Sequence, residues 1–413
     1  MTERPAIFVT GLGTVTAAGV GCEALAAQLA TGRPLVTEVD RAEGYHGAGC
    51  ARLAALVPTP DFPRWIPPLE ARRMSAPSRF AVVAALGALE DAGRGHGTEP
   101  DPAMAVSLGT AFGPSAWTQR LLDQILVEGP QAASPALFTE SVANAPAGRV
   151  ALACRASGPN HTFSQGEASP LLAVARAADE LVHGTATLAL AGASDEMTPL
   201  LHAILERFGA LAHPVPGGVE EARPFGAGRT GFLAAEGAAV VVLERAEAVA
   251  GRDARPRVRL RAWATAFDPT ASRVGWGRGS EALAATLSGE LGRAGVALGS
   301  IDLVISGASG SRAGDRLEAE ILSRLWPGAS RPAVLAPKAI TGEYGGGFLA
   351  AAVLLAAGAE ATFPAFPADP DLDVTPVAGA WPGGARRTLV TALASGGGAA
   401  WLVLDRVDGR GWK

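Results

Sequence analysis

The sequence predicts an α/β fold of two related halves, in which a mostly parallel, buried sheet is covered by helices. Segments of strand character alternate with segments whose apolar residues recur at helical spacing, the pattern of βαβ units. The same rhythm occurs before and after a polar stretch at Arg252–Pro256. The 413 residues are 48% hydrophobic and 18% charged, a composition that favours a large core over disorder.

The first half is assigned to residues 1–250. It opens with a short strand at Ala6–Val9, followed by a glycine-rich turn at Gly11–Gly13. Residues 51–73 hold five prolines between Pro58 and Pro68, so we expect an irregular surface excursion there. Helical spacing and short apolar runs predict the remaining elements, which are helices at 78–92, 117–127 and 169–183 and strands at 103–108, 186–191 and 238–243.

The second half is assigned to residues 251–413 and repeats the alternation. The apolar run at Gly347–Gly358 is shorter than the roughly 20 residues that span a bilayer, so it is expected to be a core helix. The same reasoning predicts strands at 258–262, 302–306, 387–392 and 401–404 and helices at 280–294, 315–324 and 348–357.

Charge and cysteine usage exclude several classes of function. The net charge is -5, with no basic stripe of the kind that binds nucleic acid. The three cysteines do not have metal-ligand spacing, and Gly11–Gly13 does not complete a dinucleotide fingerprint because Thr16 takes the third glycine position. The N-terminal residues do not have the features of a signal peptide. We therefore expect a cytoplasmic protein without a metal, nucleic-acid or membrane site.

Several short motifs occur in a fixed order along the chain. They are, from the N-terminal end, IFVTGLGTVTAAGVG from Ile7, Arg72-Arg73-Met74, Glu90-Asp91-Ala92-Gly93, Arg223-Pro224-Phe225, Gly228-Arg229, Gly231-Phe232, Ala235-Glu236-Gly237-Ala238, Asp302-Leu303-Val304, Pro337-Lys338 and Thr341-Gly342. Together they resemble the landmarks of beta-ketoacyl synthases, from about Ala6 to Leu404. The resemblance implies a thiolase-like fold of two pseudo-duplicated, layered α/β halves.

The residues that carry out catalysis in that family are replaced. Its enzymes use a cysteine at a helix N-terminus and two histidines that stabilise the enolate formed on decarboxylation. On the matching motifs, the cysteine position is Glu167 and the histidine positions are Gly307 and Glu343. No histidine follows His213, so the second half cannot supply a histidine pair under any alignment. The closing loop, which usually bears a phenylalanine, is here Leu393–Gly398.

This pattern is similar to the chain-length factor, the beta subunit of type II polyketide synthases. The resemblance implies a heterodimer with an active, cysteine-bearing ketosynthase, which extends chains held on the phosphopantetheine arm of an acyl carrier protein. The subunit itself would need no cofactor. Chain-length factors usually have glutamine at the cysteine position, so Glu167 is a departure. The loop Gly342–Gly347 favours the polyene-forming branch of chain-length factors over the branch that forms aromatic products.

The resemblance also implies which residues limit chain length. Tunnel-facing side chains are expected after Gly113, namely Ser115, Trp117, Thr118, Leu121 and Leu122. A bulky side chain there would close the tunnel, and a smaller one would lengthen it. The alternative is that Trp117 and the leucines are ordinary helix-packing residues.

Other readings of the degenerate site remain open. Glu167 could promote decarboxylation, although we favour a structural carboxylate stabilised by the helix dipole. Ser164 or Ser169 could act as a nucleophile with His161, or Glu167 itself could react, which would make the chain a stand-alone acyltransferase. Lys338 is expected to be an ion-pair partner. A structural homodimer without a polyketide role is a third possibility.

Overall fold

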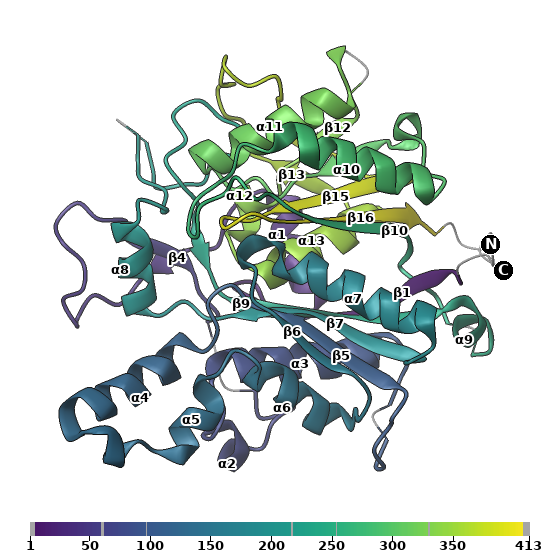
Figure 1. The fold of residues 1–413 in the computed structure, drawn as a ribbon. Coiled ribbons are helices and arrows are strands. Elements are labelled where there is room, and N and C mark those ends of the chain that lie inside the picture. Colours follow the sequence, from purple (N-terminus) through teal and green to yellow (C-terminus); the bar gives the residue numbers. More distant parts are fainter. Residues whose placement is uncertain are drawn as a thin grey trace.

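The computed structural model describes residues 5–58, 62–95, 97–215, 218–252, 254–328 and 331–407. One large mixed sheet runs through the molecule (Figure 1). Its strands are, in spatial order, β12 (Ala333–Leu335), β11 (Leu303–Ile305), β15 (Arg387–Leu393), β16 (Gly398–Arg406), β10 (Val258–Phe267), β1 (Ile7–Thr16), β9 (Gly237–Arg245), β7 (Leu188–Asp195), β5 (Met104–Gly109) and β6 (Asn160–Phe163). The short β2 (Gly19–Val20) pairs with β1.

The expected mostly parallel sheet is wrong. Parallel pairing occurs between β5 and its neighbours β6 and β7, and between β11 and its neighbours β12 and β15. The central strands β7, β9, β1, β10, β16 and β15 pair antiparallel. Alternation of strands and helices does not report strand direction, and the hairpin between β15 and β16 is too short for a parallel crossover.

Helices form three layers around the two halves of the sheet (Figure 1). The first-half strands carry α3 and α6 on one face, while α10 and α11 cover the second-half strands on the opposite side. Between them, α7 and α13 contact strands of both halves. The helices of these layers are α3 (Ala76–Asp91), α6 (Ala145–Cys154), α7 (Ser169–His183), α13 (Gly345–Ala356), α10 (Ser280–Arg293) and α11 (Arg312–Leu325).

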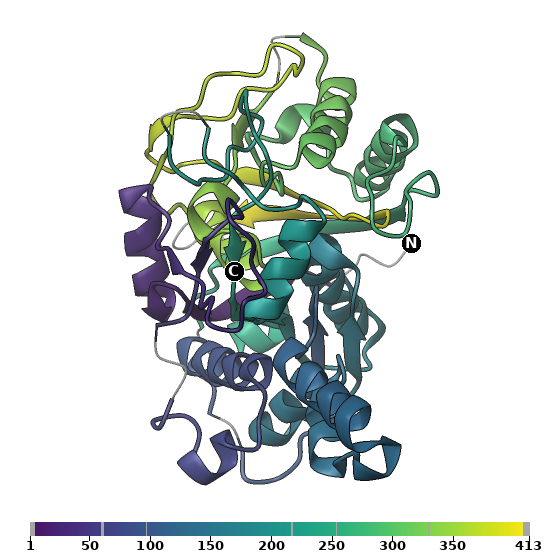
Figure 2. The same ribbon diagram turned by 90° about the vertical axis from the view of Figure 1, so that its left-hand side faces the viewer.

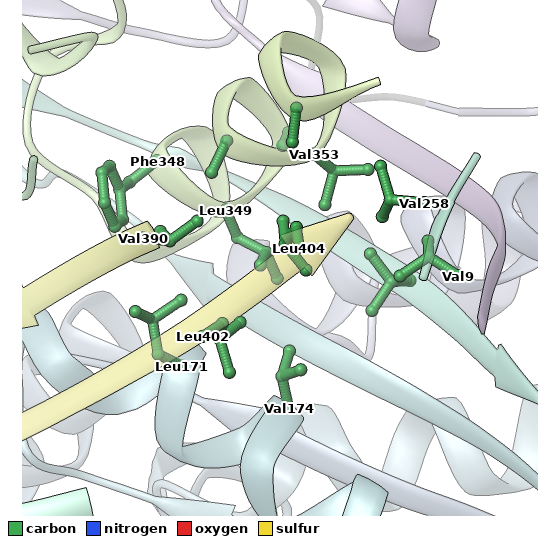
Figure 3. Packing of buried hydrophobic residues seen from close by; sticks show 14 of the residues in the cluster. Val9, Leu171, Val174, Val258, Phe348, Leu349, Val353, Val390, Leu402 and Leu404 are labelled. Atoms are coloured by element: carbon green, nitrogen blue, oxygen red, sulfur yellow. The ribbon is translucent and has the colours of Figure 1, made fainter. Parts of the chain in front are cut away.

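The central layer is the apolar centre of the molecule. Every residue of α13 is buried, so the apolar run predicted as a core helix is one. Phe348 and Leu349 of α13, Leu402 of β16 and Leu171 of α7 belong to one buried cluster (Figure 3). This shared core joins the two halves. No helix of the described residues is long and apolar enough to cross a membrane.

The expected turn at Gly11–Gly13 is wrong, because both glycines lie inside β1. A methyl group at Gly13 would lie 2.0 Å from the Ala84 carbonyl oxygen of α3, and one at Gly11 would lie 2.1 Å from that of Ala88. The glycines are therefore needed for close approach of a helix to a strand, which is a use of glycine other than a turn.

Residues 51–73 are not simply a surface excursion. Of the described part of this segment, β4 (Leu53–Ala55) and α2 (Pro68–Ala71) are regular, and Phe62 and Ile66 are buried against α3. Prolines limit regular structure but do not prevent the apolar residues between them from packing.

The remaining elements are short strands and further helices. Two small sheets join β3 (Thr37–Glu38) with β4 and β8 (Ala234–Ala235), and β13 (Ala361–Phe363) with β14 (Gly379–Trp381). The other α-helices are α1 (Cys22–Thr31), α4 (Ser115–Glu128), α5 (Pro135–Ser141), α8 (Pro199–Arg207), α9 (Ala246–Ala250) and α12 (Lys338–Thr341). Of these elements, β8 and α12 are buried.

Candidate functional site

The three degenerate catalytic positions lie around one end of β15. Glu167 contacts Ser395 in the turn that joins β15 to β16. A side chain at Gly307 would meet Thr391 and Ala392 of β15. Glu343 acts electrostatically on Glu167. Because β11 and β15 are parallel, the loop that begins at Gly307 emerges at the same edge of the sheet as this turn.

Glu167 holds the β15–β16 turn. It lies in a single 3₁₀ turn, Gly166–Ala168, just before α7. The Ser395 N–H donates to Glu167 Oε2 at 3.1 Å, and the Ser395 hydroxyl lies 3.3 Å from the same oxygen. The expected closing loop at Leu393–Gly398 is thus a hairpin turn tied to the degenerate nucleophile position.

The Glu167 carboxyl is not the dipole-stabilised carboxylate expected from the sequence. Burial and the negative charge of Glu343 raise its pKa to about 7, against the opposing effects of Lys338 and of the N–H groups of Glu167 and Ser395. A large fraction of the Glu167 carboxyl is therefore protonated near neutral pH. Desolvation of the carboxyl outweighs the helix terminus here, although the Glu167 residue as a whole is half-buried.

Lys338 and Glu343 form a buried ion pair. Lys338 Nζ lies 2.7 Å from Glu343 Oε2, and the two side chains are 1% and 7% exposed. The ammonium also lies 5.0 Å from the centre of the Phe348 ring. Lys338 begins the short α12, and Gly342, at φ 73, turns the chain so that Glu343 points back to it. The pair neutralises two charges that could not otherwise be buried.

Sequence reasoning missed a second buried carboxyl beside the pair. Ser306 Oγ donates to Glu318 Oε1 at 2.7 Å, and the Thr391 hydroxyl donates to the same oxygen. Burial is the main cause that raises the pKa of Glu318 to about 7. The available signal was a glutamate at an inward-facing position of α11, between the buried Leu317 and Ala319.

Gly307 leaves no room for the histidine that it replaces. A methyl group at this position would lie 2.7 Å from the Thr391 carbonyl oxygen and 3.2 Å from the Ala392 Cα. These neighbours are backbone of β15, which cannot rotate away. A side chain at this position would therefore require β15 to shift.

The serine–histidine pairs considered from the sequence are not formed. Ser169 is buried, where its hydroxyl donates to the Thr110 carbonyl at 3.1 Å and accepts from the Gln165 N–H. His161 Nε2 instead lies 2.9 Å from Glu180 Oε1. Ser164 is exposed. Within the described residues, no group of three histidine, cysteine, aspartate or glutamate side chains could hold a metal ion.

The five candidate chain-length residues lie on α4 in different surroundings. The Ser115 hydroxyl donates to Glu196 at 3.2 Å, and the Thr118 hydroxyl binds backbone carbonyls. Trp117 is half-buried, with the Arg120 guanidinium 5.2 Å from its ring centre. Leu121 is buried, whereas Leu122 is exposed. The helix is thus anchored by polar bonds at its start and presents apolar side chains beyond them.

An exposed apolar surface continues along α4 and α5, which project from the lower end of the molecule (Figures 1 and 2). Leu126 and Val127 are 80% and 84% exposed, and Phe138 of α5 is 60% exposed. Isolated exposed apolar residues are ordinary, but several on one helical hairpin indicate a surface that another molecule covers. We call Leu122, Leu126, Val127 and Phe138 the α4–α5 patch.

The sheet also ends in an open edge. β6 (Asn160–Phe163) pairs with β5 on one side and is the last strand in the sheet order of the described residues. An edge strand presents unpaired N–H and C=O groups to its surroundings. The α4–α5 patch and this edge both belong to the first half.

Comparison with known proteins extends over both halves. Residues 4–248 match the family profile described as Beta-ketoacyl synthase, N-terminal domain. The tetracenomycin polyketide synthase ketoacyl synthase beta subunit of Streptomyces glaucescens is 30% identical over 359 residues, which is 84% of each chain. The structure of the ishigamide ketosynthase/chain length factor matches with a TM-score of 0.85 at 27% identity, over 98% of this chain and 100% of that one. A beta-ketoacyl synthase from Burkholderia phymatum matches with the same TM-score at 25% identity over the same shares. The predicted thiolase-like α/β fold is confirmed.

Proposed function

This chain belongs to the beta-ketoacyl synthase family, and we propose that within it the chain is a non-catalytic chain-length factor of a type II polyketide synthase. The observation that carries the proposal is the set of residues at the family's catalytic positions. These positions hold a protonatable glutamate, a glycine enclosed by backbone and a glutamate paired with lysine. None of these groups supplies a thiolate or an imidazole.

The chemistry of condensation cannot proceed with these groups. Chain transfer needs a nucleophile that holds the chain as a thioester, and the carboxyl of Glu167 could form only an anhydride with the acyl group. The enolate from malonyl decarboxylation needs hydrogen-bond donors aimed at its oxygen. Among the described residues, the cationic donor that ion-pair contacts place in this cluster is Lys338, and its ammonium is already paired with Glu343. The catalytic step is therefore assigned to a partner.

The partner is an active ketosynthase, which pairs with this chain as a heterodimer. The open edge of β6 and the α4–α5 patch offer backbone hydrogen bonds and apolar area on the first half. Obligate interfaces are typically large and apolar. The tetracenomycin relative is itself named as a beta subunit, which supports a two-subunit assembly.

The role of this subunit is to shape the tunnel for the growing chain. Ser115, Trp117, Thr118, Leu121 and Leu122 on α4 are its proposed chain-length residues. The acyl carrier protein supplies the chain on its phosphopantetheine arm, so this subunit needs no cofactor of its own. We place the pair in the cytoplasm and favour a polyene product.

Native mass spectrometry of the chain co-expressed with its genomic neighbours tests the proposal. The expected result is a one-to-one complex with a cysteine-bearing ketosynthase. A stable homodimer that becomes acylated in the absence of a partner would overturn it and favour the acyltransferase alternative, in which Ser164, Ser169 or Glu167 reacts. The bonds of Ser169 to Thr110 and of His161 to Glu180 stand against that alternative.

A further inference from the structure

Helix α4, which carries the proposed chain-length residues, begins without a cap of its own. The residue before its first turn is Pro114, whose side chain does not accept a hydrogen bond. The first N–H groups of an α-helix do not have acceptors within the helix, so they need acceptors from elsewhere. The position of α4 therefore depends on what another element supplies at Ser115 and Ala116.

Glu196, in the segment that follows β7, supplies such an acceptor. Its Oε1 accepts from the Ala116 N–H at 2.7 Å and from the Ser115 hydroxyl at 3.2 Å. The Glu196 residue is buried. The Thr198 hydroxyl, which caps α8, lies 3.4 Å from that of Ser115. The segment after β7 thus joins the start of α4 to the start of α8.

The neighbouring Asp195 fixes the chain that leads into α4. Its Oδ1 accepts from the Thr110 hydroxyl at 2.8 Å and from the Ala111 N–H at 2.7 Å. Asp195 is the last residue of β7, which lies between β9 and β5 in the large sheet. Two consecutive buried carboxyls therefore tie the start of α4 to the sheet.

Beyond its start, α4 packs chiefly against elements that project with it. These are α5 and the 3₁₀ turn Pro130–Ala132 (Figure 1). The bonds at the start of α4 therefore contribute much of what holds this helix to the sheet. A small displacement of its first turn would move the side chains of Trp117 and Thr118 relative to the rest of the molecule.

We propose that Glu196 is a positioning residue for product length, which it controls by holding the first turn of α4. This inference rests on the function proposed above, in which side chains of α4 line the tunnel. Glu196 itself does not touch the growing chain. It acts through Ser115, whose hydroxyl it binds, and through the backbone that sets the direction of Trp117.

The anchor needs an oxygen that accepts hydrogen bonds rather than a negative charge. Burial is the main cause that raises the pKa of Glu196 to about 7, against the hydrogen bonds from Ala116 and Ser115. The protonated and the ionised carboxyl both keep an accepting oxygen, and a glutamine amide keeps one as well. Glu196→Gln should therefore preserve the anchor, and Glu196→Ala should remove it.

Hydrogen exchange of the isolated full-length chain tests the anchor directly. We expect residues 113–122 to exchange about fivefold faster in Glu196→Ala, the factor that loss of one ordinary hydrogen bond gives, and at the wild-type rate in Glu196→Gln. Ser115→Ala, which removes one of the two bonds without emptying a buried site, should raise the exchange rate by less. Asp315→Asn is the matched control, because Asp315 is a buried carboxyl that accepts backbone N–H groups just before α11. It should leave exchange of residues 113–122 unchanged.

Mass spectrometry of the products released by the reconstituted pair tests the consequence for chain length. For Glu196→Ala, we expect the ratio of the main product to its neighbouring chain lengths to fall about fivefold. Glu196→Gln and Asp315→Asn should keep the wild-type ratio. Circular dichroism checks that each variant is folded.

Each part of the proposal has its own contrary outcome. Unchanged exchange in Glu196→Ala and Ser115→Ala would refute the anchor. Faster exchange with unchanged product lengths would refute its control of length, and so would an equal fall in the product ratio for Asp315→Asn. A wild-type chain that forms no pair would contradict the proposed function and the control of length with it, whereas the exchange experiment decides the anchor without a partner.

Discussion

Glu167 and Glu343 compete for the stabilising effect of one buried ammonium. Glu343 forms the direct contact with Lys338, and Glu167 is left with the N–H and hydroxyl of Ser395. The pKa of Glu167 is therefore raised to about 7. A folded-state pKa above the unfolded value means that the folded protein holds a proton which the unfolded chain has already released.

Glu167→Gln should change how stability depends on pH. Between the usual glutamate pKa and about 7, deprotonation is easier in the unfolded chain, so the wild type loses stability as pH rises through this window. Glutamine has no charge to bury. We expect the melting temperature of the wild type to fall relative to that of Glu167→Gln between pH 5 and pH 8, in thermal unfolding experiments.

The exposed Glu320→Gln is the control for this prediction, because it removes a carboxyl from α11 without emptying a buried site. Its pH profile should follow that of the wild type. Parallel profiles for all three proteins would show that Glu167 is not protonated in the folded state.

Lys338→Met should destabilise the fold strongly. Removing the ammonium leaves Glu343 buried without a counter-charge, which typically costs about 3–5 kcal/mol of unfolding free energy. The double variant Lys338→Met/Glu343→Gln should recover most of the loss, since no charge remains. Denaturant unfolding measures all three proteins.

Arg64→Met is the matched control, because Arg64 pairs with Glu90 at the surface, where both side chains are more than half exposed. Its cost should be about 0–1 kcal/mol. A loss of equal size at Arg64 and Lys338 would contradict the assignment of a stabilising buried pair.

At the scale of elements, the close contact between β1 and α3 depends on glycines in β1, which have no side chain. A methyl group at Gly13 would overlap the Ala84 carbonyl oxygen, and the helix cannot withdraw without opening the core beneath it. Gly13→Ala should therefore cost about 3 kcal/mol of unfolding free energy. Gly148→Ala, within α6 and with open space around it, should instead gain about 0.5–1 kcal/mol.

Chemical denaturation of the two glycine variants decides this point. If Gly13→Ala were as stable as the wild type, β1 and α3 would be further apart than the structure places them.

Helix α4 carries the prediction about product length. Trp117 is the bulkiest of its candidate tunnel residues, so Trp117→Ala should lengthen the tunnel and give longer products from the reconstituted pair. Asp123→Ala, six residues further along the same helix, exposed and outside the α4–α5 patch, should leave product length unchanged. Mass spectrometry of the released chains measures both. Unchanged length for Trp117→Ala with intact pairing would make Trp117 a packing residue only.

The elements themselves were largely predictable, and their directions were not. Residues 169–183 were predicted as a helix and form α7 with the same bounds, because its apolar spacing is regular. The strand propensity of β10 and β16 can also be recognised from neighbouring residues. Their antiparallel pairing, however, joins residues about 140 apart in the sequence. Such pairing depends on tertiary packing, which no local pattern encodes.

The candidate site was likewise predictable in part: its positions could be found from the sequence, but some of its contacts could not. The motifs gave the positions of Glu167, Gly307 and Glu343, since replaced residues can be counted directly. They did not reveal that Glu318 joins the cluster or that Ser395 binds Glu167. The Glu318 contacts arise only when the ends of β11 and β15 meet, and the Glu167 contact arises only when the β15–β16 turn reaches the start of α7.

For the whole molecule, the α4–α5 patch predicts dependence on a partner. Phe138→Glu places a charge in an apolar surface, so it should abolish co-purification with the ketosynthase. Val274→Glu is the control, because Val274 is 70% exposed in the loop after β10, far from the patch in sequence. Size-exclusion chromatography of co-expressed pairs measures the complex. Retention of the complex by Phe138→Glu would place the interface elsewhere.

The position of β1 in the middle of the sheet governs when this protein can fold. β1 is made first, but its hydrogen-bonding partners β9 and β10 follow only after residue 237. A ribosome must therefore synthesise more than half of the chain while β1, which is buried at every position, has only the two-residue β2 to pair with. Apolar strands exposed in this way are prone to aggregate. The protein is thus expected to rely on chaperones during synthesis, and its yield in a heterologous host should depend on them.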